Sequence, residues 1–285
     1  MSDSCEILLC PACGAPTRQR YLYSKEACDI LRCEECGIGR TETAEFDPTS
    51  YYGKDYFSGG YFDGYADYIG AEPVLRREFA RVVAFLRQHC AGGRLLEIGC
   101  AYGFFLQEAR TYFFDVVGIE LVEDAAAYCR CSGLHVLDGA PDEDKFRRLG
   151  TMDAIVLLDV IEHLPEPKQT IELCSRHLSP GGALLLTTGD FGSLFARIIG
   201  SNWRLMTPPQ HLWFFTRESM KRLSKGAGLE FVSCDHPWKI VPLSLILFQL
   251  ARILGMQPTR RPQTSRFGVP VNLFDAMRVV LRKPS

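Results

Sequence analysis

The stretch LLEIGCAYGFF at residues 95–105 combines the two features on which the predicted fold depends. An apolar run ends near the acid Glu97, and Gly99 and Gly103 then bracket a short turn before apolar residues resume. Such a run is typical of a buried strand, and glycines after it let the main chain approach a ligand closely. The stretch therefore predicts a strand, a glycine turn and a helix that together form part of a binding site.

From residue 94 onward, short apolar runs alternate with segments of helical periodicity. This alternation predicts an α/β fold with a doubly wound, mostly parallel sheet, whose ligand crevice lies at the carboxyl ends of the strands. The expected strands are residues 94–98, 115–119, 134–137, 153–158 and 183–188, followed by strands within 228–239 and 275–283. The expected helices are residues 72–90, 103–112, 122–132, 142–149, 167–179 and 216–227.

Acidic residues follow the glycine turn at the next strand ends. Residues 97–103 read E-x-G-x-x-x-G, and Ala101 replaces the middle glycine of a dinucleotide fingerprint, which favours a nucleoside over a pyrophosphate. Glu120 ends the second strand, where an acid can hold both hydroxyls of a ribose. Asp138 and Gly139 end the third strand, where an acid can accept a hydrogen bond from an adenine amino group.

The fourth strand runs into LLDVIEHLPEP at residues 157–167, which carries Asp159, Glu162 and His163. Taken in order, LLEIGCAYGFFL, VVGIE, LDG, DAIVLLDVIEHLPEP and LSPGGALLLTT resemble the motifs of the class I S-adenosylmethionine-dependent methyltransferases. The similarity covers about residues 70–240, and the ordered set is far more specific than any single motif. It implies a Rossmann-like sheet of seven strands, in which the seventh strand pairs antiparallel with the sixth.

The resemblance also implies a cofactor, S-adenosyl-L-methionine, and a set of residues that bind it. The amino-acid tail of the cofactor would cross Gly99 and Gly103, Glu120 would bind the ribose diol and Asp138 the adenine edge. The strand end near Asp159 would receive the methionine portion. The expected cofactor-binding residues are Glu97, Gly99, Gly103, Glu120, Asp138, Gly139 and Asp159.

WRLMTPPQHLWFFT, residues 203–216 and here called the histidine loop, follows the fifth strand. It resembles a loop of the ubiquinone-pathway and sugar-methylating branches of this family, and the resemblance implies an insert at 190–215 that covers the acceptor pocket. An imidazole with an ordinary pKa can take the proton of a hydroxyl, so His211 is the first candidate base. The alternative is a structural histidine bonded to a backbone carbonyl. His163 is the rival candidate base.

Two C-x2-C-G motifs near the N-terminus, CPACG at residues 10–14 and CEECG at 33–37, have the spacing of a zinc ribbon. The segment between them fits two or three short strands. Four thiolates leave no position for water, so the expected zinc is structural rather than catalytic. The predicted ligands are Cys10, Cys13, Cys33 and Cys36. Accidental cysteine pairs or a redox dithiol are the alternatives, but no thioredoxin-like unit accompanies them.

Three domains are expected: a zinc ribbon at 1–45, an aromatic linker and N-terminal helix at 46–92, and the methyltransferase domain at 93–285. The linker, rich in tyrosine, could pack its rings on the next domain or act as a lid over the site. Residues 241–255 are apolar but too short to span a membrane. They could form a helix over the pocket, a dimer surface or a segment that rests on a membrane.

The composition narrows the functional class. The formal net charge is −2, so no basic excess favours a nucleic-acid partner, and no secretory signal or membrane span is evident. A cytoplasmic enzyme is expected that methylates a hydroxyl of a small-molecule acceptor, such as a sugar, a lipid-linked compound or a secondary metabolite. The alternatives are an RNA methyltransferase that grips RNA with the zinc ribbon, and a non-catalytic adaptor that binds the cofactor. The sequence leaves the oligomeric state open.

Overall fold

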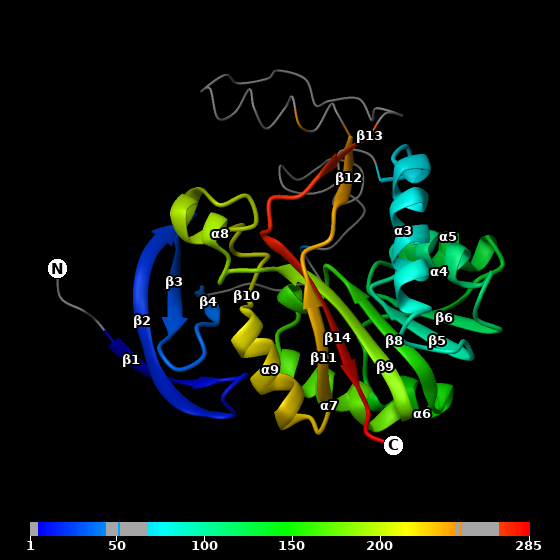
Figure 1. Cartoon of the computed structure of the whole chain (residues 1–285), viewed down its shortest axis with the longest axis horizontal. Helices are drawn as coiled ribbons and strands as arrows, with labels where there is room; N and C mark the ends of the chain where they lie inside the picture. The colour runs from blue at the N-terminus through cyan, green and yellow to red at the C-terminus, as the bar shows by residue number, and fades with distance from the viewer. Residues whose placement is uncertain (1–4, 44–50, 52–67, 243–245, 247–267) are drawn as a thin grey trace.

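The computed structural model describes residues 5–43, 51, 68–242, 246 and 268–285. Its largest sheet has seven strands in the order β11-β14-β9-β8-β5-β6-β7 (Figure 1). Five neighbouring strands, from β9 to β7 in this order, pair parallel, and β14 pairs antiparallel with both β9 and β11. The strands are β5 (Arg94–Ile98), β6 (Asp115–Glu120), β7 (His135–Asp138), β8 (Met152–Leu158), β9 (Leu178–Gly189), β11 (Glu230–Asp235) and β14 (Ala276–Arg282). The predicted Rossmann-like methyltransferase sheet is confirmed.

Helices cover both faces of this sheet, because successive residues of a buried strand point to opposite sides. The fully buried Leu95 packs on one side with α3, α4 and α5, whereas its neighbour Leu96 packs on the other with α6, α7 and α9. The helices are α3 (Glu72–Leu86), α4 (Phe104–Ala109), α5 (Glu123–Cys131), α6 (Glu143–Leu149), α7 (Pro167–His177) and α9 (Arg217–Gly226). This two-sided burial is why the parallel strands read as continuous apolar runs.

The strand boundaries differ from the expected ones mainly at β9. It begins at Leu178 rather than at residue 183, because Leu178 already pairs with Met152 before an irregularity in the register. Gly181 takes a positive φ of 76° inside this segment. The Pro-Gly-Gly sequence at residues 180–182 therefore lies within an irregular strand start.

A second sheet has five strands, in the order β1-β2-β3-β4-β10. Four are N-terminal: β1 (Cys5–Cys10), β2 (Ala15–Lys25), β3 (Cys28–Cys33) and β4 (Gly39–Glu42). The fifth, β10 (Trp213–Phe214), comes from the histidine loop and pairs antiparallel with β4. Figure 1 shows this small sheet beside α8 (Leu194–Ile199) and α9, on one flank of the large sheet. The N-terminal segment and the larger domain thus share one sheet.

A buried cluster fixes the segment after β9 against this second sheet. Phe191, Trp203 and Phe214 pack with Ile30 of β3. Trp203 Nε1 donates a hydrogen bond to the buried Asp275 at 2.9 Å. A short 3-10 turn, η2 (Gly200–Asn202), lies between α8 and Trp203.

Two predicted segments fall largely outside the described residues. Most of the aromatic linker does so, although Tyr68 is described and stacks on Tyr102 and Phe104. Most of the apolar segment 241–255 does so as well; its first two residues end β12 (Lys239–Pro242), which pairs with β13 (Gly268–Val271). Across the parts of the chain that the structure describes, no helix is both long and apolar enough to cross a membrane.

Candidate active site and cysteine cluster

The glycine turn at the carboxyl end of β5 is held by three residues in the left-handed region. Gly99, Ala101 and Gly103 have φ values of 74°, 46° and 72°. A Cβ atom on Gly99 would lie 2.6 Å from Val160 Cγ2, and one on Gly103 would lie 2.5 Å from Leu134 Cδ1. Glycine is therefore required at both positions for packing as well as for backbone conformation. Ala101 has a Cβ atom, so this left-handed conformation costs it free energy.

Glu120 stabilises this turn from the end of the neighbouring strand. Its Oε2 accepts a hydrogen bond from the Ala101 N–H at 2.7 Å, and its Oε1 accepts one from the Val122 N–H at 2.9 Å. Burial raises the pKa of Glu120, while the hydrogen bonds from these backbone groups act in the opposite direction. A carboxylate has about four acceptor positions, so Glu120 can still accept from a ligand hydroxyl. The sequence predicts the ligand role but gives no sign of the two backbone hydrogen bonds.

Glu97 is a buried carboxyl group beside Glu120, with 3% of the residue exposed. Its Oε2 has no hydrogen-bond partner among the described residues. Burial, with Cys129 and Glu120 nearby, raises the pKa of Glu97 well above its ordinary value. A buried oxygen without a partner calls for a donor that the protein does not itself supply. The position fits a ligand that brings a donor group to the tip of β5.

The third strand end approaches the second. Gly139, at a φ of 96°, donates its N–H to the Glu120 carbonyl at 2.8 Å. The carboxylate of Asp138 is mostly exposed and lies 3.3 Å from Arg130 Nη1. The parallel strands β5, β6 and β7 thus bring the expected cofactor-binding residues to one edge of the sheet, as their common direction requires.

Asp159 follows β8 with a left-handed φ of 54°. It accepts hydrogen bonds from Thr187 Oγ1 and from Lys239 Nζ, both at 2.9 Å. Burial alone would raise the pKa of Asp159, but Lys239 and Thr187 outweigh it and the pKa is lowered. Asp159 is therefore an anion at neutral pH, next to a lysine that the sequence places far away.

Glu162, His163 and His211, here called the imidazole cluster, lie next to Asp159. One candidate ligand atom from each of the three residues lies within 4.8 Å of the others. The rings of the two histidines are 4.7 Å apart between centroids and inclined at 71°. The sequence presents these histidines as rival bases of one pocket, and the structure brings their rings together. Glu162 lies in the same motif as His163, but the sequence predicts no role for it.

The hydrogen bonds of the cluster fix the tautomers of both rings. His163 Nδ1 donates to the Gln210 carbonyl at 3.0 Å, and His211 Nδ1 donates to the Leu205 carbonyl at 2.8 Å, since a carbonyl oxygen can only accept. The lone pair of each neutral imidazole therefore lies on Nε2. Burial, together with His163, lowers the pKa of His211 to about 3, so this ring is neutral near pH 7.

Glu162 is 4% exposed, and its Oε2 has no hydrogen-bond partner among the described residues. Burial, with the nearby charge of Asp159, raises the pKa of Glu162 to about 8. Too little positive charge thus surrounds the carboxyl group to keep it fully ionised at neutral pH.

The N-terminal sheet holds the backbone beside this cluster. Thr41 of β4 donates its hydroxyl to the His211 carbonyl at 2.6 Å. Its N–H donates to the Leu212 carbonyl at 3.0 Å, and the Leu212 N–H donates to the Glu162 carbonyl at 2.9 Å. A continuous set of hydrogen bonds therefore joins β4, the histidine loop and the 3-10 turn η1 (Ile161–His163).

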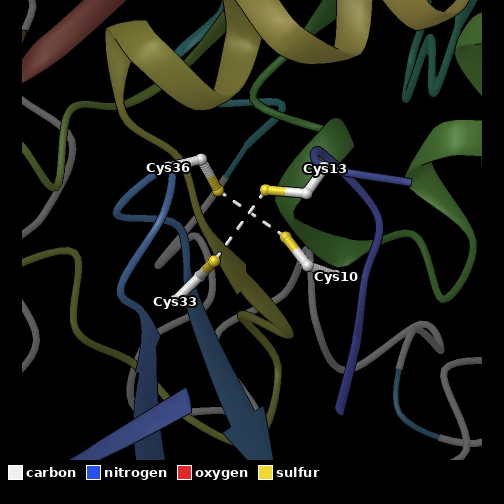
Figure 2. A group of neighbouring side chains, drawn as sticks. All are labelled: Cys10, Cys13, Cys33 and Cys36. Atoms are coloured by element: carbon white, nitrogen blue, oxygen red, sulfur yellow. Dashed lines mark hydrogen bonds between the residues drawn. The ribbon is translucent and has the colours of Figure 1, made fainter. Parts of the chain in front are cut away.

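The four cysteines of the two C-x2-C motifs converge, and Figure 2 shows their sulfur atoms pointing to a common centre. The Sγ atoms of Cys10 and Cys36 are 3.6 Å apart, and those of Cys13 and Cys33 are 4.0 Å apart. Four sulfurs at 2.3 Å from a tetrahedral zinc ion would be about 3.8 Å apart, so the cluster has the right size for zinc. Arg222 of α9 donates to Cys13 Sγ at 3.4 Å, which ties the cluster to the larger domain.

Sequence comparison supports the assignment that the sheet suggests. Residues 72–234, more than half of the chain, match the profile of a family described as "Methyltransferase domain". A ubiquinone biosynthesis O-methyltransferase of Azoarcus sp. (strain BH72) is 28% identical over 160 residues, or 51% of this chain and 68% of that protein. One from Aromatoleum aromaticum is 26% identical over 155 residues, or 49% of this chain and 65% of that protein. These alignments span about two thirds of the relatives' length.

Solved structures share the fold at low sequence identity. A SAM-dependent methyltransferase from Archaeoglobus fulgidus matches with a TM-score of 0.51 at 17% identity, covering 75% of this chain and 97% of that one. A chain from the complex between the Trm112 methyltransferase activator of Haloferax volcanii and a methyltransferase matches with a TM-score of 0.52 at 15% identity, covering 76% of this chain and 95% of that one. The profile match shows that this chain belongs to the methyltransferase-domain family. Together with the glycine turn and the named relatives, it identifies the chain as a class I S-adenosylmethionine-dependent methyltransferase.

Proposed function

We propose that this enzyme transfers the methyl group of S-adenosylmethionine to a hydroxyl oxygen of a small molecule, such as a sugar, a lipid-linked compound or a secondary metabolite. The observation that carries the proposal is the imidazole cluster at the end of β8, beside the edge of the sheet that holds the expected cofactor residues. Relatives named as ubiquinone biosynthesis O-methyltransferases support oxygen as the methylated atom.

On the cofactor side, each predicted residue receives a role that its position permits. Gly99 and Gly103 keep the turn of β5 open to the amino-acid tail. Glu120 accepts from the ribose hydroxyls with its remaining lone pairs, and Glu97 offers its unpartnered oxygen to a donor of the cofactor. Asp138 and Gly139 lie beside the adenine edge, and Asp159 beside the methionine portion. The bound cofactor supplies an electrophilic methyl group on a sulfonium.

On the acceptor side, the hydroxyl must be aligned with the methyl group and must lose its proton. We assign this task to the imidazole cluster, with His211 and His163 as the catalytic residues. Nε2 of each ring carries a lone pair that could accept the proton directly. The low pKa of His211 makes that ring a weak proton acceptor, because its burial disfavours the charged imidazolium. His211 is therefore poorly suited to accept the proton alone.

We further propose that residues 1–45 form a zinc ribbon with a structural zinc ion on Cys10, Cys13, Cys33 and Cys36. The sulfur separations support this ligand set. Residues 46–92 would connect the ribbon to the methyltransferase domain at 93–285, with the insert at 190–215 over the acceptor. The ribbon would then act by supporting the histidine loop through Thr41.

The proposal is tested by incubating the protein with methyl-labelled cofactor and pools of small metabolites. Mass spectrometry identifies the compound that gains the label, and NMR of the product distinguishes an O-methyl group from an N- or C-methyl group. Label on a small-molecule oxygen is the expected result. Label that appears only in RNA, with salt-dependent RNA binding, would replace this proposal with an RNA methyltransferase. Cofactor binding by calorimetry without transfer to any pool would point to an adaptor.

A further inference from the structure

We propose that Asp190, His236 and Phe274, here called the dyad subsite, bind a sugar ring of the acceptor through a second hydroxyl group and one apolar face. The hydroxyl would bond to the imidazole of His236, and the C–H face of the ring would pack on Phe274. The subsite stands on the geometry of these three residues. That the ring it holds is the methyl acceptor rests on the proposed function.

Asp190 and His236 form a hydrogen-bonded pair of a carboxylate and an imidazole. His236 Nε2 donates to Asp190 Oδ2 at 2.9 Å, since a carboxylate oxygen can only accept. The lone pair of the neutral ring therefore lies on Nδ1, which has no partner among the described residues. The side chain of Asp190 is 9% exposed and that of His236 is 29% exposed. The carboxylate is thus shielded, while the imidazole stays open to a ligand hydroxyl.

Backbone groups fix both members of this pair. Asp190 Oδ1 accepts a hydrogen bond from the Gly192 N–H at 2.9 Å, and the Asp190 N–H donates to the Asp275 carbonyl at 2.8 Å. Asn272 Nδ2 donates to the His236 carbonyl at 2.8 Å. The orientation of the imidazole is therefore set before a ligand binds, which reduces the entropy cost of binding.

Phe274 provides the independent observation that points to a ligand. Its φ of 54° is left-handed, which is rare for a bulky side chain, and Asn272 Oδ1 holds this turn by accepting the Phe274 N–H at 2.8 Å. Phe274 is 61% exposed, so burial in the protein does not offset the cost of its conformation. Its ring lies 6.2 Å from the His236 ring between centroids. Strained residues are typical of ligand sites, and an exposed aromatic face beside a polar group suits a sugar ring.

The dyad subsite lies at the edge of the sheet that carries the imidazole cluster. Asp190 follows the carboxyl end of β9, which pairs parallel with β8. The preceding Gly189 packs so closely on Leu205 that a Cβ atom there would lie 3.0 Å from Leu205 Cδ1, and the Leu205 carbonyl accepts from His211. Neighbouring strands lie about 4.8 Å apart, which is comparable with the separation of two hydroxyls on one sugar ring.

The segment after β11 also connects the subsite to the end of β8. His236 directly follows Asp235, the last residue of β11. Lys239 of the same segment donates to Asp159 at 2.9 Å, and Asp159 lies next to Glu162 of the imidazole cluster. The segment therefore crosses the carboxyl edge of the sheet from β11 towards β8, and His236 lies at the start of this crossing.

Saturation-transfer NMR on the full-length protein tests the subsite. The protein is saturated with S-adenosylhomocysteine, the demethylated cofactor, and the probes are methyl glycosides of hexoses, with catechol as an aromatic diol for comparison. We expect saturation to pass to the ring protons of a methyl glycoside. His236→Ala should raise the dissociation constant of that glycoside about five-fold or more, since one hydrogen bond is lost.

Phe274→Gly separates a ligand role from a structural one. Glycine adopts this φ without strain, so the variant should bind the glycoside about five-fold more weakly or worse without a lower Tm. His177→Ala, at the end of α7, and Phe114→Ala, which replaces an aromatic side chain that is 81% exposed, are the matched controls and should bind normally. No transfer to any glycoside, transfer to catechol alone, or affinity unchanged in both subsite variants would overturn the inference.

The labelled product distinguishes failure of this inference from failure of the proposed function. The inference requires that the product keep at least one free hydroxyl on the ring that carries the new methoxy group. Label on the oxygen of a compound without a second hydroxyl would support the proposed function and reject the subsite. Glycoside binding with the expected variant pattern, but label only on nitrogen or carbon, would retain the subsite and reject the hydroxyl acceptor.

Discussion

The left-handed turn at Ala101, which follows β5, is maintained by the side chain of Glu120 at the end of the neighbouring strand β6. Ala101 lacks the freedom of glycine, yet its N–H is drawn onto the Glu120 carboxylate at 2.7 Å. A hydrogen bond to a charged group contributes about 1.5–3 kcal/mol, which can offset the cost of the backbone conformation. Glu120 therefore has two roles, in maintaining the turn and, as proposed, in binding the ribose.

Replacing Glu120 by glutamine should separate these roles in part. Glu120→Gln retains one acceptor oxygen but loses the charge and one backbone hydrogen bond. We expect calorimetry to give an affinity for S-adenosylmethionine at least about ten-fold weaker, because charge-assisted hydrogen bonds to the ribose become neutral ones. Thermal unfolding should show a lower Tm as well. Unchanged affinity with a lowered Tm would leave Glu120 with the structural role alone.

The raised pKa of Glu97 predicts that the free energy of unfolding depends on pH. Its folded-state pKa is raised by burial, so folding favours the protonated form. This contribution is fully present below the ordinary pKa of about 4.5 and is lost as the pH rises through the raised folded-state pKa. Glu97→Gln should remove that loss, since the amide never ionises. Urea unfolding without cofactor should show an advantage for the variant that is larger at pH 8.5 than at pH 5.5; an advantage that does not change with pH would contradict the assignment.

The two histidines that we propose to be catalytic can be compared directly. His211→Ala and His163→Ala should each lower turnover by about 100-fold or more, as expected for groups that activate the acceptor, and leave cofactor affinity nearly intact. Labelled-cofactor assays and calorimetry measure these two quantities. If only His163→Ala loses turnover, His211 is structural, held by its hydrogen bond to Leu205. Activity retained in both variants would mean that alignment of the acceptor suffices.

At the scale of elements, the two-residue strand β10 connects the N-terminal sheet to the imidazole cluster. Trp213 and Phe214 pair with Arg40 and Gly39 of β4, and the Trp213 indole donates to the Leu164 carbonyl at 3.0 Å. So short a strand has little stability of its own and depends on its neighbours on both sides. The position of His211 therefore depends on residues about 170 positions earlier in the sequence.

Thr41→Val tests this dependence with almost no change in volume. The variant loses the hydroxyl that donates to the His211 carbonyl, a bond that contributes about 1 kcal/mol. We expect turnover to fall about five- to ten-fold through misplacement of His211, with cofactor affinity unchanged. Thr111→Val, at an exposed helix end, is the matched control. Equal turnover in the two variants would mean that β4 does not position the loop.

The elements also show what could be predicted from the sequence. The strands β5, β6, β8 and the acids at their tips follow from local apolar runs and the polar residues that end them, so their positions agree closely with expectation. The pairing of β4 with β10 could not be predicted in this way, because two residues are too short for a periodic signal. The resemblance predicts that His163 and His211 reach the same pocket, but the direct contact between their rings could not be predicted from local patterns.

At the scale of the molecule, the cysteine cluster and the large sheet share one hydrophobic core. Cys10, Cys33 and Cys36 are buried with residues of β5, β8 and α9, and Thr216 donates to the Cys36 carbonyl at 2.9 Å. The predicted domain boundary at residue 45 gives no indication of this shared core, because contacts between two domains leave no periodic pattern in the sequence. The effect of zinc should therefore extend beyond the N-terminal sheet.

Removal of zinc is the corresponding experiment. Metal analysis should find one zinc ion per chain in the cysteine cluster, and none there in a Cys10→Ala/Cys33→Ala variant. A strong chelator should unfold the N-terminal sheet, because so small a unit has little core without its metal. Hydrogen exchange should then report faster exchange in both β4 and β10. Turnover should fall in parallel; zinc loss with full activity would contradict the coupling.

The pairing of β4 with β10 has a consequence for protein engineering. A truncated chain that starts after the N-terminal sheet would leave the edge of Trp213 and Phe214 unpaired, with the apolar side chains that pack on Phe214 uncovered. Exposed strand edges of this kind invite association between chains. Grafting the catalytic half onto a different zinc module would succeed only if the graft carried an equivalent of β4 in the same register. When segments are exchanged between related enzymes, β4 and β10 must therefore be transferred together.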